Sequence, residues 1–363
     1  MTIIRKPGIY FEEETTVTSR YDDTKIPLLI IQGATEIAAL DGQVTLVTDF
    51  DAFKTLTNNK GLTNTIDYIE DVILESGIGQ FYVYKVATDT ATTFTNIFKE
   101  TANLTEIVDV AYIEETKSAN TNTLTSKIGA IKNGLKDNAK NGVFRECYII
   151  PYGTVQDAIT NKAEGKTDEE AAITSLTGIT EGAGNGRIIL TVPDGNAGFV
   201  VGHCIGSEYN DGIDYDAFEN VNTEDMLHFN AVQELAITNL GVLVLSRETV
   251  QGVTQYRLYL GVTTSFKEDE SDGYIRSRRV CDELLRQLKF QAEPLIKRPE
   301  PVEEEDISTI LTGIIDRFAN NGDISADGTA LEVTDNGDQT FGVTGTITTT
   351  KPLLVIDVNT ILK

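Results

Sequence analysis

Short apolar runs alternate with stretches of helical periodicity along the chain, and this alternation constrains the fold more than any other feature. Runs with the composition of strands lie at 26–32, 44–47, 81–86, 107–113 and 144–150. Apolar residues at helical spacing fall between them, at 66–74 and 124–135. Strands and helices that alternate in this way predict an α/β fold.

Punctuating residues support the helices of this first half. Asp49 is suited to cap a short helix through Leu56, and Thr63 is suited to cap the next one. Gly77 and Gly79 are expected to end that second helix before the strand at 81–86.

The composition changes at 154–187, where Thr, Glu, Lys, Ala and Gly dominate, and this span is expected to be an insertion or a surface hairpin. A strand at 188–192 is ended by the turn residues 193–196. Helices are expected at 276–291 and 307–320, joined by an acidic connector at 294–305. The remaining expected strands are 240–245, 256–262, 330–333, 341–349 and 353–358.

Both ends of the chain are strand-capable. Ile9, Tyr10 and Phe11 follow the Pro7-Gly8 break, and a polar run separates them from the first core strand. At the other end the apolar residues are Leu353, Leu354, Val355, Ile356 and Val358. A free strand can complete the sheet of a neighbouring chain, so both segments are candidate links between subunits.

Composition excludes several classes of protein. The 363 residues carry a net charge of −26, which disfavours binding to nucleic acid and to anionic membranes. We find no apolar run long enough to insert into a bilayer and no secretion signal, so assembly in the cytoplasm is expected. Cys147, Cys204 and Cys281 show no metal-binding spacing and are expected to be buried thiols.

Candidate chemistry is weak throughout. His203 beside Cys204 suggests a catalytic pair, but neighbours on a strand point to opposite faces; His228 is placed on a helix. The glycines of 182–186 precede a strand, whereas a phosphate-binding loop must follow a strand and open a helix. The segment 323–328 resembles the start of a calcium-binding loop, but Thr334 occupies the position where a bidentate Glu is needed. The closely spaced acids at 211–216 are expected in so acidic a chain. We expect no catalytic, cofactor or metal site.

The helix at 276–291 is unusual in so acidic a chain. Its apolar side carries Val280, Cys281, Leu284, Leu285 and Leu288. Its basic side carries Arg276, Arg278, Arg279, Arg286 and Lys289. Two interpretations stay open: a solvated face paired with neighbouring acids, or an attachment surface for an acidic partner.

Several segments resemble contractile tail sheath proteins, the family that jackets the tube of myophages, R-type bacteriocins and related injection machines. The N-terminal PGIYFEEE at 7–14, LVTDFDAFKTL at 46–56 and GIGQFYVYKVA at 77–87 follow one another in family order. The segments 240–245, 260–262 and 274–280 continue that order. At 261–264 the chain has Gly-Val-Thr-Thr where the family often has Gly-Ala-Arg-Thr, so no role is transferred to that arginine.

The resemblance implies an inner α/β domain built from both chain termini, a middle outer α/β domain and extended terminal β-strand arms. On this basis we expect an N-terminal linking arm at 1–25, an outer domain at 26–264, an inner tube-facing domain at 265–349 and a C-terminal linking strand at 350–363. The basic helix would then contact the tube.

The resemblance also implies a helical homo-oligomer around a tail tube protein, with baseplate and tail terminator proteins at its ends. Such a subunit would belong to a virion tail, use no cofactor and contract by improved packing between subunits. A sheath of a phage-derived bacteriocin or of an extracellular contractile injection system is an alternative. Two further alternatives are a nucleotide-binding α/β enzyme, which ranks lower, and a surface-layer protein, which the lack of a secretion signal disfavours.

Overall fold

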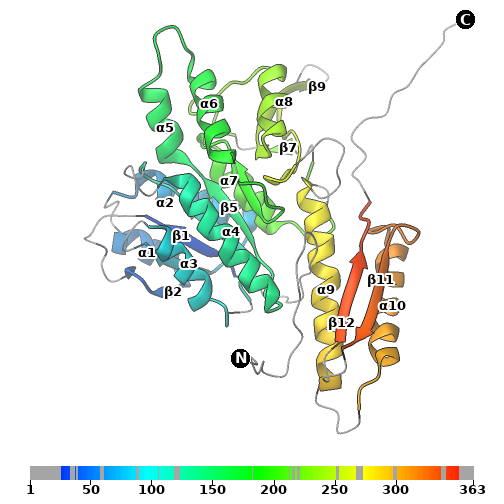
Figure 1. Cartoon of the computed structure of the whole chain (residues 1–363). Helices are drawn as coiled ribbons and strands as arrows, with labels where there is room; N and C mark the ends of the chain where they lie inside the picture. The colour runs from blue at the N-terminus through cyan, green and yellow to red at the C-terminus, as the bar shows by residue number, and fades with distance from the viewer. Residues whose placement is uncertain are drawn as a thin grey trace, which may run out of the picture.

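A seven-stranded mixed sheet forms the centre of the computed structural model, in the order β2-β3-β1-β4-β5-β6-β8 (Figure 1). Its strands are β1 (Leu28–Ile31), β2 (Val44–Val47), β3 (Phe81–Lys85), β4 (Asp109–Ile113), β5 (Glu146–Ile150), β6 (Ile188–Thr191) and β8 (Val242–Leu243). All neighbours in the sheet are parallel except β2, which pairs antiparallel with β3 at one edge. The chain therefore has an α/β fold, as expected, with a mixed sheet because the edge strand β2 is antiparallel.

The structure describes residues 26–32, 37, 40–57, 61–86, 90–104, 106–117, 123–181, 183–211, 213–214, 217–218, 221–250, 253–266, 273–296, 301–336 and 341–350. The predicted linking segments 9–11 and 353–358 lie outside these residues. In the described part, no helix is long and apolar enough to cross a membrane.

Helices cover both faces of this sheet. On one face lie α1 (Phe50–Thr57), α2 (Thr63–Ser76) and α7 (Ala197–Gly206). On the other lie α3 (Ala91–Glu100), α4 (Leu124–Lys140), α6 (Asp168–Thr180) and α8 (Ala231–Asn239). Alternate strand residues serve the two layers: in β1, Leu29 and Ile31 join one apolar cluster, and Leu28 and Ile30 join the other. Continuous apolar runs in the sequence arise because these strands are buried on both sides.

Helix α7 packs unusually close to α2 because three glycines line the contact. Gly198, Gly202 and Gly206 are spaced by four residues, so they lie on one face of the helix. A Cβ atom on Gly202 would lie 2.8 Å from the carbonyl oxygen of Val72. The two backbones therefore approach to a distance that only glycine permits at this position.

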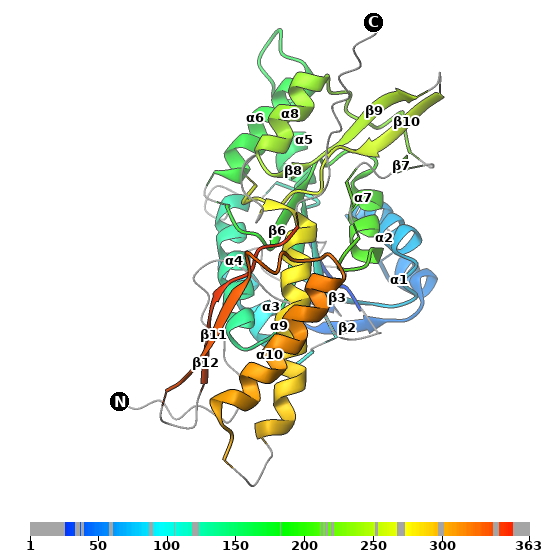
Figure 2. The same ribbon diagram turned by 90° about the vertical axis from the view of Figure 1, so that its right-hand side faces the viewer.

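The last part of the chain forms a smaller unit beside the sheet, which we call the C-terminal unit (residues 273–350). It consists of α9 (Ile275–Ile296), α10 (Glu304–Asn320) and the antiparallel pair β11 (Ala330–Asp335) and β12 (Phe341–Thr346). Its own apolar cluster joins α9 to α10 through residues such as Leu284, Leu288 and Ile314. Figures 1 and 2 place α9 between the central sheet and the rest of this unit.

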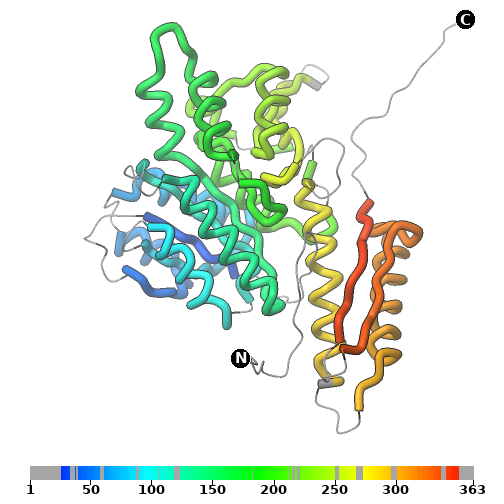
Figure 3. Tube along the Cα trace, in the orientation of Figure 1, coloured from blue at the N-terminus to red at the C-terminus, as the bar shows by residue number. Residues whose placement is uncertain are grey.

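Two hairpins project from the sheet. Helix α5 (Tyr152–Thr160) and α6 form a helical hairpin at the span where an insertion or surface hairpin was expected, and the trace in Figure 3 shows its connection at one extremity of the molecule. Strands β9 (Leu245–Val250) and β10 (Val253–Leu258) form the second hairpin, which pairs with β7 (Ala217–Phe218).

Several local expectations are wrong. His203 lies in helix α7 rather than in a strand, and His228 precedes α8 instead of lying in a helix. Helix α9 continues through Pro294, where a connector was expected, and α3 had no counterpart in the expected elements. The expected inner domain built from both chain termini stays a prediction, because residues 1–25 and 351–363 lie outside the described residues.

Candidate functional site at helix α9

Helix α9 joins the C-terminal unit to the sheet through side chains that are buried between them. Arg279 is 1% exposed and Arg278 is 4% exposed. Two buried arginines in consecutive positions require partners, because an isolated charge away from water is strongly unfavourable. Both find carboxylates within the chain.

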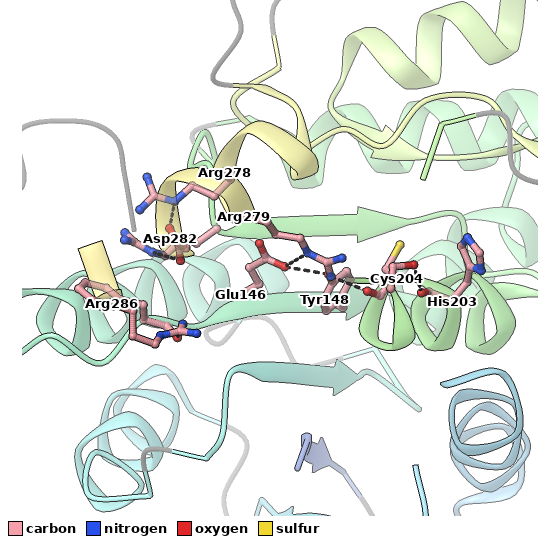
Figure 4. A network of polar contacts seen from close by, with 11 residues as sticks. Glu146, Tyr148, His203, Cys204, Arg278, Arg279, Asp282 and Arg286 are labelled. Carbon is pink, nitrogen blue, oxygen red and sulfur yellow. Dashed lines mark hydrogen bonds and ion pairs between the residues drawn. The ribbon is translucent and has the colours of Figure 1, made fainter. Parts of the chain in front are cut away.

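Arg279 reaches the middle of the sheet. Its Nε donates to Oε2 of Glu146 over 3.0 Å, and its Nη2 donates to the hydroxyl of Tyr148 and to the carbonyl of Cys204 in α7. Figure 4 shows this side chain extended between β5 and α7. One guanidinium therefore ties α9, β5 and α7 together.

Tyr148 completes this network as a donor. Burial raises the pKa of its phenol well above the usual value, so the hydroxyl stays protonated. It donates to Oε2 of Glu146 over 2.9 Å. Glu146 thus receives two hydrogen bonds on one oxygen while it balances the charge of Arg279.

Asp282, one helical turn after Arg278 in α9, is the centre of a second group of ion pairs. Nε of Arg278 is 2.7 Å from Oδ1 of Asp282, and Nε of Arg187 is 3.8 Å from Oδ2 of the same carboxylate. All three side chains are buried. Since Arg187 immediately precedes β6, Asp282 links α9 to a second strand of the sheet.

The far end of the basic side contacts backbone carbonyls. Nη2 of Arg286 donates to the carbonyl of Phe144 over 3.3 Å, and Nζ of Lys289 donates to the carbonyl of Gly142 over 3.0 Å. Burial lowers the pKa of Lys289. Gly142 follows the C-terminus of α4, where a cation interacts favourably with the helix dipole.

Arg276 begins the series and points toward the end of the described chain. Its guanidinium contacts Asn210, Asp323 and Thr350. All five predicted basic residues therefore have partners within the chain. Arg278 and Arg279 are paired with neighbouring acids, as one interpretation expected, but they are buried rather than solvated. The helical pattern identified which residues share a side, but it did not reveal that the sheet covers that side.

The carboxyl ends of β1 and β4 are where a doubly wound sheet would bind a nucleotide, since the strand order reverses there. Here protein side chains occupy the position. Oε2 of Glu115 accepts from the backbone N–H of Thr65 over 2.6 Å at the start of α2, and Oε2 of Glu114 accepts from that of Thr154 over 2.9 Å in α5. Oε1 of Gln32 accepts from the N–H of Thr116 over 3.0 Å. Helix N-termini that could hold phosphate are thus capped by the chain's own carboxylates.

The other candidates from the sequence also have structural partners. Nδ1 of His203 lies 3.5 Å from Oε1 of Glu75, and burial raises the pKa of Cys204 to about 12, which keeps it a thiol. The backbone N–H of Asn185 binds Oγ1 of Thr264 over 3.1 Å, so the described part of the glycine loop is fixed as a turn before β6. Asp214 accepts from the N–H of Gly261 over 2.6 Å.

No group of His, Cys, Asp or Glu in the described residues could hold a metal ion. All three cysteines are free and buried, as predicted.

Sequence reasoning missed the acceptors of this site. The sequence predicts Glu146 and Tyr148 only as parts of the strand at 144–150, and it predicts no role for Asp282. One signal was present: Glu146 is an acid at the start of an otherwise apolar strand, a position that requires a buried partner.

Comparison with protein-family models and with curated protein sequences gives no match. Solved structures do match in fold. The helical sheath of the anti-feeding prophage in its contracted state superposes with a TM-score of 0.63 at 13% identity, covering 99% of both chains. The sheath of the extracellular contractile injection system PVC, also contracted, gives 0.60 at 11% identity and covers 99% of this chain and 98% of that one. A sheath tail protein from Desulfitobacterium hafniense gives 0.53 at 8% identity and covers 94% and 100%. The chain therefore has the fold of contractile sheath proteins.

Proposed function

We propose that this chain, which has the fold of contractile sheath proteins, is the subunit of a contractile sheath. It polymerises helically around a tail tube and contracts to drive the tube through a target cell envelope. The agreement in fold over nearly the full length of two sheath proteins in the contracted state carries this proposal. The sequence resemblance at both the start and the later part of the chain supports it independently.

The site at helix α9 supports a structural role rather than a catalytic one. Its charged side chains form ion pairs and hydrogen bonds between parts of one chain, as Arg279 does with Glu146. The helix starts that a nucleotide would use are occupied by Glu114 and Glu115. Contraction in this proposal draws on better packing between subunits and consumes no nucleotide.

The C-terminal unit offers a place for linking strands. In the described residues, β11 and β12 form a sheet of only these two strands, and both are largely accessible. A strand from another chain can extend such a sheet by backbone hydrogen bonds. We propose that the segments 9–11 and 353–358 pair with sheets of adjacent subunits, and β11–β12 is the acceptor that this geometry favours.

In the same proposal, residues 265–349 face the tube and residues 26–264 lie outside. Of the predicted tube-facing cations, Arg278 and Arg279 are buried within the chain and are not available to a tube in this conformation. Arg276, Arg286 and Lys289 keep part of their surface. Any tube contact by this helix must therefore use those three or the neighbouring exposed residues.

The assembly to which the sheath belongs is proposed only as a class. A virion tail assembled in a bacterial cytoplasm, a bacteriocin and an extracellular injection system would each supply a tube protein, a baseplate and a terminator. The genes beside this one would separate these possibilities, because only a virion requires a capsid.

Negative-stain microscopy of the purified chain tests the proposal directly. We expect helical tubes, and monodisperse globules at high protein concentration would contradict a sheath.

A variant lacking residues 1–25 should stay folded and form no tubes. Normal tubes from that variant would show that the N-terminal segment does not link subunits.

A further inference from the structure

We propose that Arg276 anchors the root of the C-terminal segment and so passes load from that segment to the body of the subunit. The inference rests on the proposed function, because load on residues 351–363 arises only if they link subunits. Its structural part concerns described residues alone, at the point where β12 leads toward the chain end (Figure 1).

The guanidinium of Arg276 contacts three separate segments of the chain. Nη1 donates to the carbonyl oxygen and to Oγ1 of Thr350, each over 3.0 Å. Nε donates to the carbonyl of Asn210 over 2.9 Å, and Nη2 lies 3.4 Å from Oδ1 of Asp323. The planar fork of arginine suits such a junction, because its five N–H donors point in fixed directions.

Thr350 is itself held on the loop that follows α10. Its N–H donates to the carbonyl of Asp323 over 3.1 Å, and its hydroxyl donates to that of Gly322 over 2.8 Å. One residue earlier, Thr349 forms an antiparallel bridge with Ile324. The N–H of Ser325 donates to the carbonyl of Thr348 over 2.7 Å. The chain is thus attached to this loop up to its last described residue.

Charge makes Arg276 hard to replace at this junction. The side chain of Asp323 is 2% exposed and that of Arg276 is 15% exposed. Burial raises the pKa of Asp323, and the charge of Arg276 opposes that rise. A neutral residue at 276 would leave this buried carboxylate without its cation.

The anchor continues into the sheet through the same helix. Arg276 and Arg279 are three residues apart, so they lie on one side of the first turns of α9. Arg279 binds Glu146 in β5. A pull on Thr350 therefore reaches the central sheet through two arginines on a rigid helix.

The test uses the full-length protein and two variants of the junction, Arg276→Gln and Thr350→Val. Arg247→Gln is the matched control, because Arg247 is an exposed arginine on β9, outside helix α9 and the C-terminal unit. Hydrogen exchange of the Thr350 and Ser325 amides reports on the anchor in the unassembled chain. The urea concentration at which preformed tubes fall apart reports on load between subunits.

We expect exchange of both amides to rise about tenfold in Arg276→Gln and less in Thr350→Val, with no change in Arg247→Gln. Tubes of the two junction variants should fall apart at lower urea than those of the wild type and the control. Unchanged exchange in both junction variants would overturn the anchor itself. Raised exchange with equally stable tubes would overturn its role in load. If the wild type forms no tubes, the proposed function fails, while exchange still decides whether Arg276 holds the chain end.

Discussion

Nε of Arg279 and Oε2 of Glu146 lie 3.0 Å apart with both side chains buried, which joins the C-terminal unit to the middle of the central sheet. Arg145 immediately precedes β5, and its side chain binds groups on the opposite face of the sheet. Its guanidinium donates to the carbonyls of Thr101, Leu104 and Ile107, and so fixes the loop between α3 and β4. Consecutive residues 145 and 146 therefore hold structure on both sides of one strand.

Removal of Arg279 alone should be severely destabilising. Arg279→Met leaves Glu146 buried with no guanidinium, and a broken buried pair costs about 3–5 kcal/mol in the free energy of unfolding. The double variant Arg279→Met with Glu146→Leu should recover part of this loss, because it removes the charge of Glu146 together with that of Arg279. Chemical denaturation of the single and double variants measures both effects. A loss below about 1 kcal/mol in Arg279→Met would show that the pair does not hold the unit in place.

The glycine contact between α2 and α7 predicts opposite effects for two Gly→Ala substitutions. Gly202→Ala places a methyl group 2.8 Å from the carbonyl oxygen and 2.9 Å from the Cα of Val72. Forcing the helices apart should cost about 1–3 kcal/mol. Gly178→Ala in α6 meets no atom within 4 Å and should stabilise by about 0.5–1 kcal/mol, since alanine favours a helix. Thermal unfolding compares the two, and equal shifts of the melting temperature would refute close packing.

The strands of the central sheet could be predicted from the sequence, but the site could not. β2 has the predicted bounds 44–47, and β1 and β3 differ from their predicted ends by one or two residues. β1 and β3 carry their signal locally, because a strand buried on both faces is apolar throughout. The same property explains why α7 was not predicted as a helix. It is apolar nearly all round, so its pattern does not separate helix from strand.

Tertiary partners explain the remaining differences. Thr63 was expected to cap α2, but the helix begins at that residue, and Glu115 supplies the acceptor from the segment that follows β4. The helical spacing identifies the basic side of α9 correctly. Yet Glu146, the partner of Arg279, and Arg187, the partner of Asp282, each lie more than eighty residues away in sequence. No local pattern contains either relationship.

Asp71 should make stability depend on pH in an unusual direction. Burial, with Asp67 and Glu70 nearby, raises its pKa from 3.8 to about 7. The folded state therefore holds a proton that the unfolded state has released between these values, so this stabilisation is present at low pH and is lost as the pH rises through 7. We expect the free energy of unfolding to fall between about pH 4 and pH 7 in urea titrations and to level off above pH 7, with a smaller fall in Asp71→Asn. Asp194, whose pKa burial also raises to about 7, should contribute in the same direction. An identical pH dependence in wild type and Asp71→Asn would contradict the assignment.

Glu115 offers a test of the capped helix start at the edge of the sheet. Its carboxylate accepts from the N–H of Thr65 over 2.6 Å and from the side-chain amide of Asn64 over 2.8 Å, so Glu115→Ala leaves the first turn of α2 without its acceptor. Loss of a helix cap costs about 0.5–2 kcal/mol, and loss of a negative charge at a helix N-terminus adds to it. Glu164→Ala, an exposed position in the turn between α5 and α6, is the control and should change stability by less than about 0.5 kcal/mol. Denaturation gives the stability, and hydrogen exchange in the first turn of α2 locates the effect. Equal losses in the two variants, or unchanged exchange in α2, would show that Glu115 is not the cap.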